Sequence, residues 1–277
     1  MALIQVNFLS KSLRRTVPMY VILPADRMLP PGAEEKPDTP YKTLYLLHGV
    51  IGNYTDWVTG TAVQRWAEEK NLVVVMPSGD NSFYLDQESG QNSYGEFVGQ
   101  EIVEITRKMF PLSGKREDTY IAGLSMGGYG ALRNGLKYSE TFGRIGAFSS
   151  ALITEGVKER TDDSPRYIET RSYAQSILGD LEKVGESDRD PRWLVEKLKK
   201  EGKKIPEIFM TCGKQDSLLG QNHVFRDFLI DAGADVTYEE WDGGHEWDFW
   251  NSSLKKLLEW LPLEEREAGI SSGNVGL

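Results

Sequence analysis

The apolar residues of the chain fall into two kinds of block that alternate along it. Short runs such as 72–76 are apolar at consecutive positions, whereas longer segments such as 96–110 carry apolar side chains three or four positions apart. A strand that is apolar on both faces is typical of a parallel sheet covered by helices, and the wider spacing is typical of the helices. The runs predict strands at 43–47, 72–76, 119–123, 145–149, 208–212 and 236–241, and the spacing predicts helices at 60–70, 96–110, 126–137, 221–232 and 254–261.

Residues 2–24 show a different pattern, in which apolar and polar residues alternate on either side of a polar turn at 10–15. Alternation predicts two half-buried strands, which we place as an antiparallel pair at the edge of the sheet. The segment 24–41 is rich in Pro, Glu and Asp, which predicts an exposed loop. Strands that alternate with helices indicate the α/β class, with a doubly wound, mostly parallel central sheet and helices on both of its faces.

The chain shows neither an internal repeat nor an interdomain linker, so we expect a single domain over residues 1–277, a length that suits one core. Residues 150–204 interrupt the alternation with mixed charge and uneven periodicity. We predict an insertion over one end of the sheet there, which either caps a ligand site or forms the surface of a homodimer. The polar, Gly- and Ser-rich residues 264–277 predict a frayed tail.

Composition and charge narrow the classes of partner. Hydrophobic residues make up 39% of the chain and the net charge is −10. The chain can therefore build a core, and its acidic surface argues against nucleic acid or an anionic membrane as a partner. The lone cysteine, Cys212, excludes an internal disulfide and is expected to be a buried structural thiol. The N-terminus lacks the pattern of a signal peptide, and no apolar run approaches the ~18 residues of a membrane span. We expect a cytoplasmic protein, with secretion left open.

The most specific motif is Gly123-Leu124-Ser125-Met126-Gly127, which fits G-x-S-x-G between a predicted strand and a predicted helix. In that setting the serine occupies a sharp, strained turn that presents its hydroxyl at the carboxyl end of the sheet. Larger side chains at the two glycines would clash with neighbouring backbone, and the N-terminus of the following helix faces developing negative charge. We therefore predict that Ser125 is a catalytic nucleophile; the alternative is a glycine-rich turn without chemistry.

A serine nucleophile needs a histidine as general base, and the chain has three: His48, His223 and His245. In the chain order Ser, Asp, His the base follows the last strand, and His245 alone follows 236–241. His223 falls within the predicted helix 221–232, where a place on the helix surface is expected. His48 ends a buried strand, and we expect it to be structural and to hold the loop that carries an oxyanion donor.

The acid of such a triad comes from the loop after the penultimate strand, where Asp216 follows 208–212. Asp216 would accept a hydrogen bond from Nδ1 of His245 and stabilise the imidazolium that forms during the reaction. Asp242 and Asp248 flank the histidine and are rival candidates, although their positions favour turn and surface roles.

A tetrahedral intermediate also needs two preorganised N–H donors. The backbone N–H of Met126, directly after the nucleophile, is the first candidate. The second comes from the loop after an earlier central strand, which here is 48–52, and we choose the N–H of Val50. Both are main-chain groups, so the residue types at these positions carry little information about them.

Aromatic residues on the loops around Ser125 are candidates for the lining of a substrate pocket. Trp57 and Trp247 are the preferred substrate-binding residues, because they adjoin the oxyanion loop and the catalytic histidine. For Phe83, Tyr84 and Trp250, pocket lining and simple packing of the loops are equally open.

Several segments together resemble a known family: 46–49, Gly52, 56–57, 76–77, 123–128, 212–213, 216–219 and 243–250. They resemble the esterase D family, which includes S-formylglutathione hydrolases, tributyrin-type short-chain esterases and acetyl-xylan and feruloyl esterases, over about residues 2–262. The resemblance implies the α/β-hydrolase fold, with 150–204 as a small cap insertion. It also implies a Ser-Asp-His triad, which falls on Ser125, Asp216 and His245, and neither a metal nor an organic cofactor.

Within this family the chain more closely resembles the tributyrin- or cinnamoyl-type esterases, since the S-formylglutathione hydrolases commonly carry a cysteine soon after the oxyanion loop and this chain has none there. We therefore expect a serine carboxylesterase acting through an acyl-enzyme on short-chain acyl or aryl esters, such as acetyl, butyryl or feruloyl esters, as small molecules or linked to carbohydrate. One alternative is a thioester hydrolase acting on S-formylglutathione. A second is a non-catalytic binding protein of the same fold, which the three filled triad positions disfavour.

Overall fold

The computed structural model describes residues 1–26, 28, 40–87 and 92–264. Within these residues eight strands form one sheet, in the order β1-β2-β4-β3-β5-β6-β7-β8. The strands are β1 (Ala2–Ser10), β2 (Arg15–Leu23), β3 (Lys42–Leu47), β4 (Leu72–Pro77), β5 (Thr119–Leu124), β6 (Arg144–Phe148), β7 (Glu207–Gly213) and β8 (Val236–Trp241). From β4 to β8 all neighbours pair in parallel, whereas β2 pairs antiparallel with β1 and with β4. The predicted parallel sheet with an antiparallel edge is confirmed.

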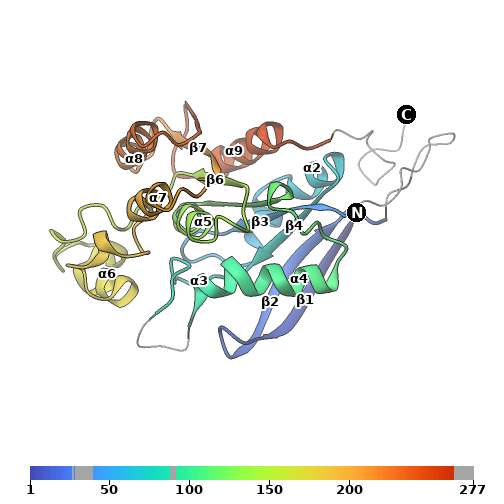
Figure 1. Cartoon of the computed structure of the whole chain (residues 1–277), viewed down its shortest axis with the longest axis horizontal. Helices are drawn as coiled ribbons and strands as arrows, with labels where there is room; N and C mark the ends of the chain where they lie inside the picture. Colours follow the sequence, from blue (N-terminus) through green and yellow to red (C-terminus); the bar gives the residue numbers. More distant parts are fainter. Residues whose placement is uncertain (27, 29–39, 88–91, 265–277) are drawn as a thin grey trace.

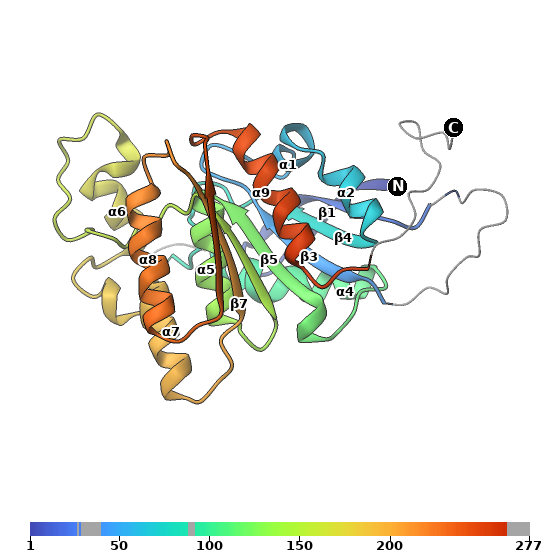
Figure 2. The same cartoon turned by 90° about the horizontal axis from the view of Figure 1, so that it is seen from above.

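Helices cover both faces of the sheet (Figure 1). One face carries α1 (Asp56–Gly60), α2 (Val63–Glu69) and α9 (Trp247–Trp260), whose apolar side chains form one core with the strands. A second core includes apolar side chains from α4 (Ile102–Met109), α5 (Met126–Lys137), α6 (Arg171–Leu178), α7 (Pro191–Lys200) and α8 (Leu219–Asp231). Helices α6, α7 and α8 gather at one end of the molecule (Figure 2). The remaining short helical turns are α3 (Tyr94–Glu96), η1 (Phe97–Glu101), η2 (Arg116–Asp118), η3 (Tyr167–Glu169) and η4 (Val184–Glu186).

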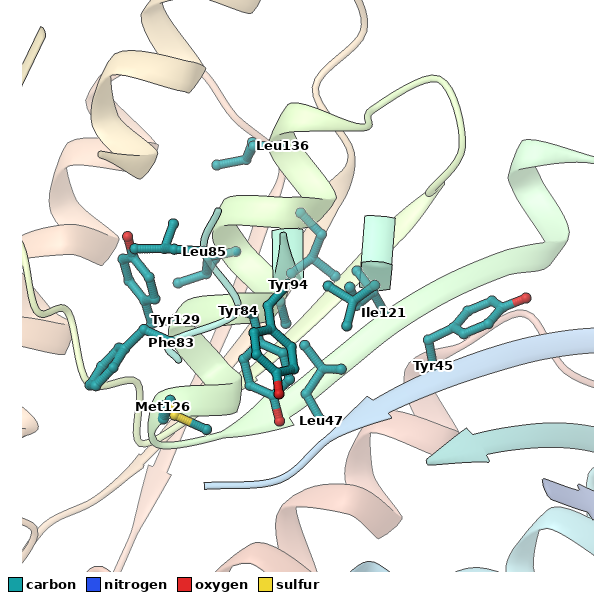
Figure 3. Close-up of a cluster of buried hydrophobic side chains, with 14 of the residues drawn as sticks. Tyr45, Leu47, Phe83, Tyr84, Leu85, Tyr94, Ile121, Met126, Tyr129 and Leu136 are labelled. Carbon is teal, nitrogen blue, oxygen red and sulfur yellow. The ribbon is translucent and has the colours of Figure 1, made fainter. Parts of the chain in front are cut away.

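Figure 3 shows part of the core around α5. Ile121 of β5 and Leu47 of β3 lie beneath side chains of α5, among them Met126 and Tyr129, and all four are buried. A strand that is apolar on both faces, such as β5, packs this core on one side and the α9 core on the other. Both faces of β5 are therefore buried, and Ser125 directly follows its last residue.

Three helix predictions differ from the structure at their ends. The helix predicted at 60–70 is α2, which begins only at Val63 after the separate short helix α1, and the one predicted at 96–110 begins with the π-helical turn η1 before α4. The last helix begins at Trp247 and not at 254, because Phe249 and Trp250 bury themselves on the same face as Leu254. His245 therefore lies just before a helix N-terminus.

The segment 150–204 differs from the prediction of an insertion over one end of the sheet. Its last helix, α7, packs against α5 and α8 and joins the helix layer of the crossover between β6 and β7. Parallel neighbouring strands require such a crossover, and α7 supplies it. Only the part before α7, which includes α6, lies outside this layer (Figure 2). Of the predicted tail 264–277, all but residue 264 lies outside the described residues, as do most residues of the predicted loop 24–41.

Candidate active site

The G-x-S-x-G segment forms a sharp turn between β5 and α5. Ser125 adopts φ 53° and ψ −117°, a strained conformation for a residue with a side chain. A Cβ on Gly123 would lie 2.4 Å from the carbonyl oxygen of Gly127, and a Cβ on Gly127 would lie 2.4 Å from that of Leu47. Both contacts are with backbone, which cannot swing aside, so the turn requires glycine at both positions.

Three loops at the carboxyl ends of the strands bring Ser125, His245 and Asp216 together. Nε2 of His245 lies 3.0 Å from Oγ of Ser125, and Nδ1 lies 2.9 Å from Oδ2 of Asp216. Asp216 comes from the loop after β7 and His245 from the loop between β8 and α9. Within the described residues, neither rival carboxylate, Asp242 or Asp248, forms a hydrogen bond or ion pair with His245.

The environment of Asp216 keeps its carboxyl group ionised. Burial raises the pKa of Asp216, but the hydrogen bonds from His245 and from the N–H of Leu218, at 2.9 Å, outweigh burial and leave this pKa below its ordinary value of 3.8. An ionised carboxylate only accepts hydrogen bonds, so Nδ1 of His245 carries the proton. Nε2 is then the basic nitrogen, and it faces the Ser125 hydroxyl.

The loop 48–52 lies close against the nucleophile turn. A Cβ on Gly49 would be 2.7 Å from Cδ1 of Leu124 and 3.5 Å from Cβ of Ser125. Met126 is the first residue of α5, where a backbone N–H has no acceptor within its helix. In the described part of the chain, Val50 donates none of the backbone hydrogen bonds formed outside helices and strands. Both N–H groups are thus available to a developing oxyanion.

His48 fixes this loop to the loop after β4. Its Nε2 accepts the N–H of Gly79 at 2.8 Å, so Nδ1 carries the proton and donates to the carbonyl oxygen of Gly49 at 2.7 Å. The hydroxyl of Tyr84 donates to the carbonyl oxygen of His48 at 2.9 Å. Burial holds the pKa of His48 below its ordinary value of 6.5, so the ring is neutral. His48 is structural, as expected.

Within the described residues, neither of the other two titratable groups singled out in the sequence, His223 and Cys212, forms a hydrogen bond with Ser125 or His245, although Cys212 is buried near enough to Asp216 for both burial and that charge to raise the pKa of the thiol. His223 lies on α8, one-third exposed, with Nε2 2.6 Å from Glu240. Cys212 is a free, buried thiol, as predicted, and burial raises its pKa to about 12. A thiol held neutral in this way is a poor nucleophile.

A pocket of about 280 Å³ opens over the nucleophile, and its lining is largely apolar. Its walls are Gly49, Val50, Ile51, Gly52, Asp56, Leu124, Ser125, His245, Trp247 and Trp250. Trp247 lines the pocket, and its predicted contact with substrate stays a prediction. Trp250 lines it too, with its ring edge-on to His245 and the ring centroids 4.8 Å apart. No residue of 150–204 contributes to these walls.

The prediction that Trp57 contacts substrate is corrected by the structure. Trp57 is 1% exposed, is absent from the pocket lining, and its indole N–H donates to the carbonyl oxygen of Leu47. Its ring stands edge-on to Trp247, so it supports the pocket wall from behind. Phe83 and Tyr84 are likewise buried, in the core around α5 (Figure 3). Adjacency in sequence to the oxyanion loop gave no information about the direction of the Trp57 side chain.

Among residues 1–26, 28, 40–87 and 92–264, no group of three or more His, Cys, Asp or Glu side chains could hold a metal ion. No helix in the same ranges is long and apolar enough to span a membrane.

Comparisons with known proteins place the chain among ester hydrolases. The chain is 46% identical to an acetyl esterase of Caldicellulosiruptor saccharolyticus, with 94% of this chain and 98% of the relative covered. Among solved structures it is similar to the fluorophosphonate-binding serine hydrolase FphF of Staphylococcus aureus, at 31% identity and a TM-score of 0.82, and to an S-formylglutathione hydrolase, FrmB, of the same organism, at 30% identity and a TM-score of 0.79. Both matches cover 94% of this chain and 98% of the other chain.

Fold, site and relatives together define a serine ester hydrolase of the α/β-hydrolase fold. More narrowly, the chain belongs to the family described as "Putative esterase", whose model matches residues 10–261. The resemblance inferred from the sequence motifs is thereby confirmed.

Proposed function

We propose that this protein is a carboxylesterase that hydrolyses short-chain acyl or aryl esters of small molecules or carbohydrates, with Ser125, His245 and Asp216 as its catalytic triad. One observation carries the proposal: Oγ of Ser125, the His245 ring and the Asp216 carboxylate form an unbroken chain of hydrogen bonds of 3.0 and 2.9 Å. That chain ends in a pocket of about 280 Å³ with apolar walls. The similarity to an acetyl esterase supports a short acyl group.

In the first half of the reaction, Nε2 of His245 takes the proton of Ser125 as Oγ attacks the ester carbonyl. Asp216 stabilises the imidazolium that forms. The backbone N–H groups of Met126 and Val50 hold the negative oxygen of the tetrahedral intermediate, and each such donor typically contributes about 10²–10³ in turnover. The intermediate collapses when the alcohol leaves with the proton from His245.

In the second half, a water molecule takes the place of the alcohol. His245 accepts a proton from that water as its oxygen attacks the acyl-enzyme carbonyl, the same two N–H groups hold the oxyanion, and Ser125 leaves with the proton from His245. The products are the free acid and the regenerated enzyme.

A second candidate function is the hydrolysis of S-formylglutathione, which the similarity to FrmB favours. The same triad would cleave a thioester by the same steps, so the distinction lies in substrate recognition. The measurement is a series of kcat/KM values on p-nitrophenyl acetate, butyrate and octanoate, methyl ferulate, acetylated xylan and S-formylglutathione. A dominant rate on the thioester would replace the oxygen-ester proposal.

The test of the triad is Ser125→Ala, for which we expect turnover to fall by about 10⁴–10⁶-fold. The melting temperature of the variant should stay at the wild-type value. A fluorophosphonate probe should label the wild type and leave the variant unlabelled. Substantial esterase activity in folded Ser125→Ala would overturn the nucleophile assignment. Wild-type protein that neither turns over any ester nor reacts with the probe would favour a non-catalytic binding protein.

A further inference from the structure

Ile51 adopts a backbone conformation that its side chain opposes. Its φ is 59°, in the left-handed region, where a β-branched residue is rarely found because Cβ crowds the backbone. Packing does not compensate, since Ile51 is 87% exposed, the largest exposed fraction among the large hydrophobic residues of the described chain. Isoleucine at this position therefore costs free energy twice, through its strained φ and through the exposure of an apolar side chain to water. Such a combination points to a role that the free protein does not show.

Neighbouring loops hold Ile51 in this conformation. Its N–H donates to Oδ1 of Asn81 at 2.7 Å, and the carbonyl oxygen of Asn81 accepts the hydroxyl of Tyr173 at 3.3 Å. The loop that carries Asn81 is itself strained, with positive φ at Asp80, Phe83 and Tyr84. The loop that carries Asn81 thus holds Ile51 directly, and α6 holds that loop in turn through Tyr173.

The place to which Ile51 is held is the wall of the active-site pocket. It lines that pocket together with Ser125 and His245, and it directly follows Val50, the proposed oxyanion donor. The apolar lining is completed by Leu124, Trp247 and Trp250. A ligand that fills the pocket covers part of this wall, and covering an exposed isoleucine stabilises the complex in proportion to the apolar area removed from water.

We propose that Ile51 is a specificity-determining residue, which contacts the apolar substituent of the bound ester and favours esters larger than acetates of small alcohols. The inference rests on the proposed function and narrows its substrate class. The apolar group belongs to the acyl half or to the alcohol half of the ester, and two substrate series distinguish them. One series varies the acyl group as p-nitrophenyl acetate, butyrate and octanoate. The other varies the alcohol as methyl, butyl and benzyl butyrate.

The decisive variant is Ile51→Asn, because asparagine accepts positive φ and removes the apolar contact. We expect the ratio of kcat/KM between the largest and the smallest ester of one series to fall by about tenfold, in line with discrimination by apolar contacts. The melting temperature is expected to rise, since the backbone strain is relieved. Ile51→Met keeps an apolar side chain without β-branching and should retain most of the wild-type ratio.

A matched control is Val224→Asn, which removes another exposed apolar side chain, 55% exposed on α8, and should leave both ratios at the wild-type value. A fall confined to one series identifies the half of the ester that lies against Ile51. Ratios unchanged in both series, or an equal loss on every ester including methyl butyrate, would overturn the inference while leaving the esterase proposal intact. A wild-type protein that is inactive on these esters and also on methyl ferulate and acetylated xylan would refute the proposed function itself.

Discussion

Close backbone atoms restrict Gly127, beside the nucleophile, to a residue without a Cβ. A Cβ on Gly127 would lie 2.4 Å from the carbonyl oxygen of Leu47 and 2.6 Å from that of His48. We expect Gly127→Ala to lower the free energy of unfolding by about 1–3 kcal/mol or more, as overpacking does, and to abolish ester hydrolysis because the turn must shift. Gly220→Ala is the control, since a Cβ there meets nothing within 4 Å in α8. It should raise stability by about 0.5–1 kcal/mol in urea titrations. Equal stabilities for the two variants would contradict this account.

Asp216 offers a second residue-scale prediction. Asp216→Asn preserves the shape of the side chain but removes the charge that stabilises the imidazolium, and its amide favours the wrong tautomer of His245. We expect kcat to fall about 10⁴-fold with little change in the melting temperature at pH 7. Because the pKa of Asp216 in the folded protein is depressed, the carboxylate contributes stability above pH 3.8 that is lost as the pH falls through the folded value. The variant should lack this part of the acid destabilisation, and a kcat within tenfold of wild type would remove Asp216 from the triad.

At the scale of elements, His48 joins the loop after β3 to the loop after β4. The ring is buried and neutral, and its pKa is depressed by burial. The unfolded chain therefore binds a proton at a higher pH than the folded chain, so this histidine contributes stability above about pH 6.5 that is lost as the pH falls through the lower folded value. His48→Gln keeps an acceptor for the N–H of Gly79 and removes the titration.

We expect His48→Gln to be less stable than wild type at pH 8 and to show a smaller loss of stability between pH 6.5 and pH 5. The measurement is the free energy of unfolding from urea titrations at several pH values. His223→Gln is the control, because that ring lies on the surface against Glu240. A His48→Gln profile parallel to wild type across this range would show that His48 does not titrate there.

The helices and strands also show which parts of the fold and of the site could be predicted from the sequence. Strand positions and their mostly parallel direction follow from the apolar runs and the helices between them. The loops that carry Ser125, Asp216 and His245 follow from the position of each residue after a predicted strand. The start of α9 could not be predicted, because residues 242–246, between β8 and Trp247, give no sign of where helical geometry begins. The orientation of Trp57 and the positive φ of Ile51 could not be predicted either, because contacts with segments far along the chain impose them. Local pattern fixes an element, and packing between elements decides where a side chain points.

At the scale of the whole molecule, a buried charge joins the nucleophile helix to the crossover that contains α7. The side chain of Arg133 on α5 is 2% exposed, and its guanidinium donates to a side-chain oxygen of Asp188 at 2.8 Å and to the backbone oxygen of the same residue at 3.0 Å. Asp86, from the loop after β4, lies 3.8 Å from the same guanidinium. Burial raises the pKa of Asp188, but Arg133 and Lys137 lower it by more, so both partners are charged.

Without Arg133, Asp188 keeps Lys137 as a partner, whose Nζ lies 2.7 Å from Oδ2 of Asp188, and the Asp188 side chain is 32% exposed. The loss is therefore that of the hydrogen bonds from the buried guanidinium, and we expect Arg133→Ala to lower the free energy of unfolding by about 1.5–3 kcal/mol. High salt should reduce this loss only in part, because the guanidinium itself is shielded from ions. Arg166→Ala is the matched control: Arg166 pairs with Glu169 at 3.2 Å, but the two side chains are 70% and 50% exposed. Exposed pairs of this kind contribute between 0 and about 1 kcal/mol. The measurement is the free energy of unfolding of both variants from urea titrations at low and high salt. If Arg133→Ala lost as little of this free energy as Arg166→Ala, apolar packing alone would hold the crossover to α5.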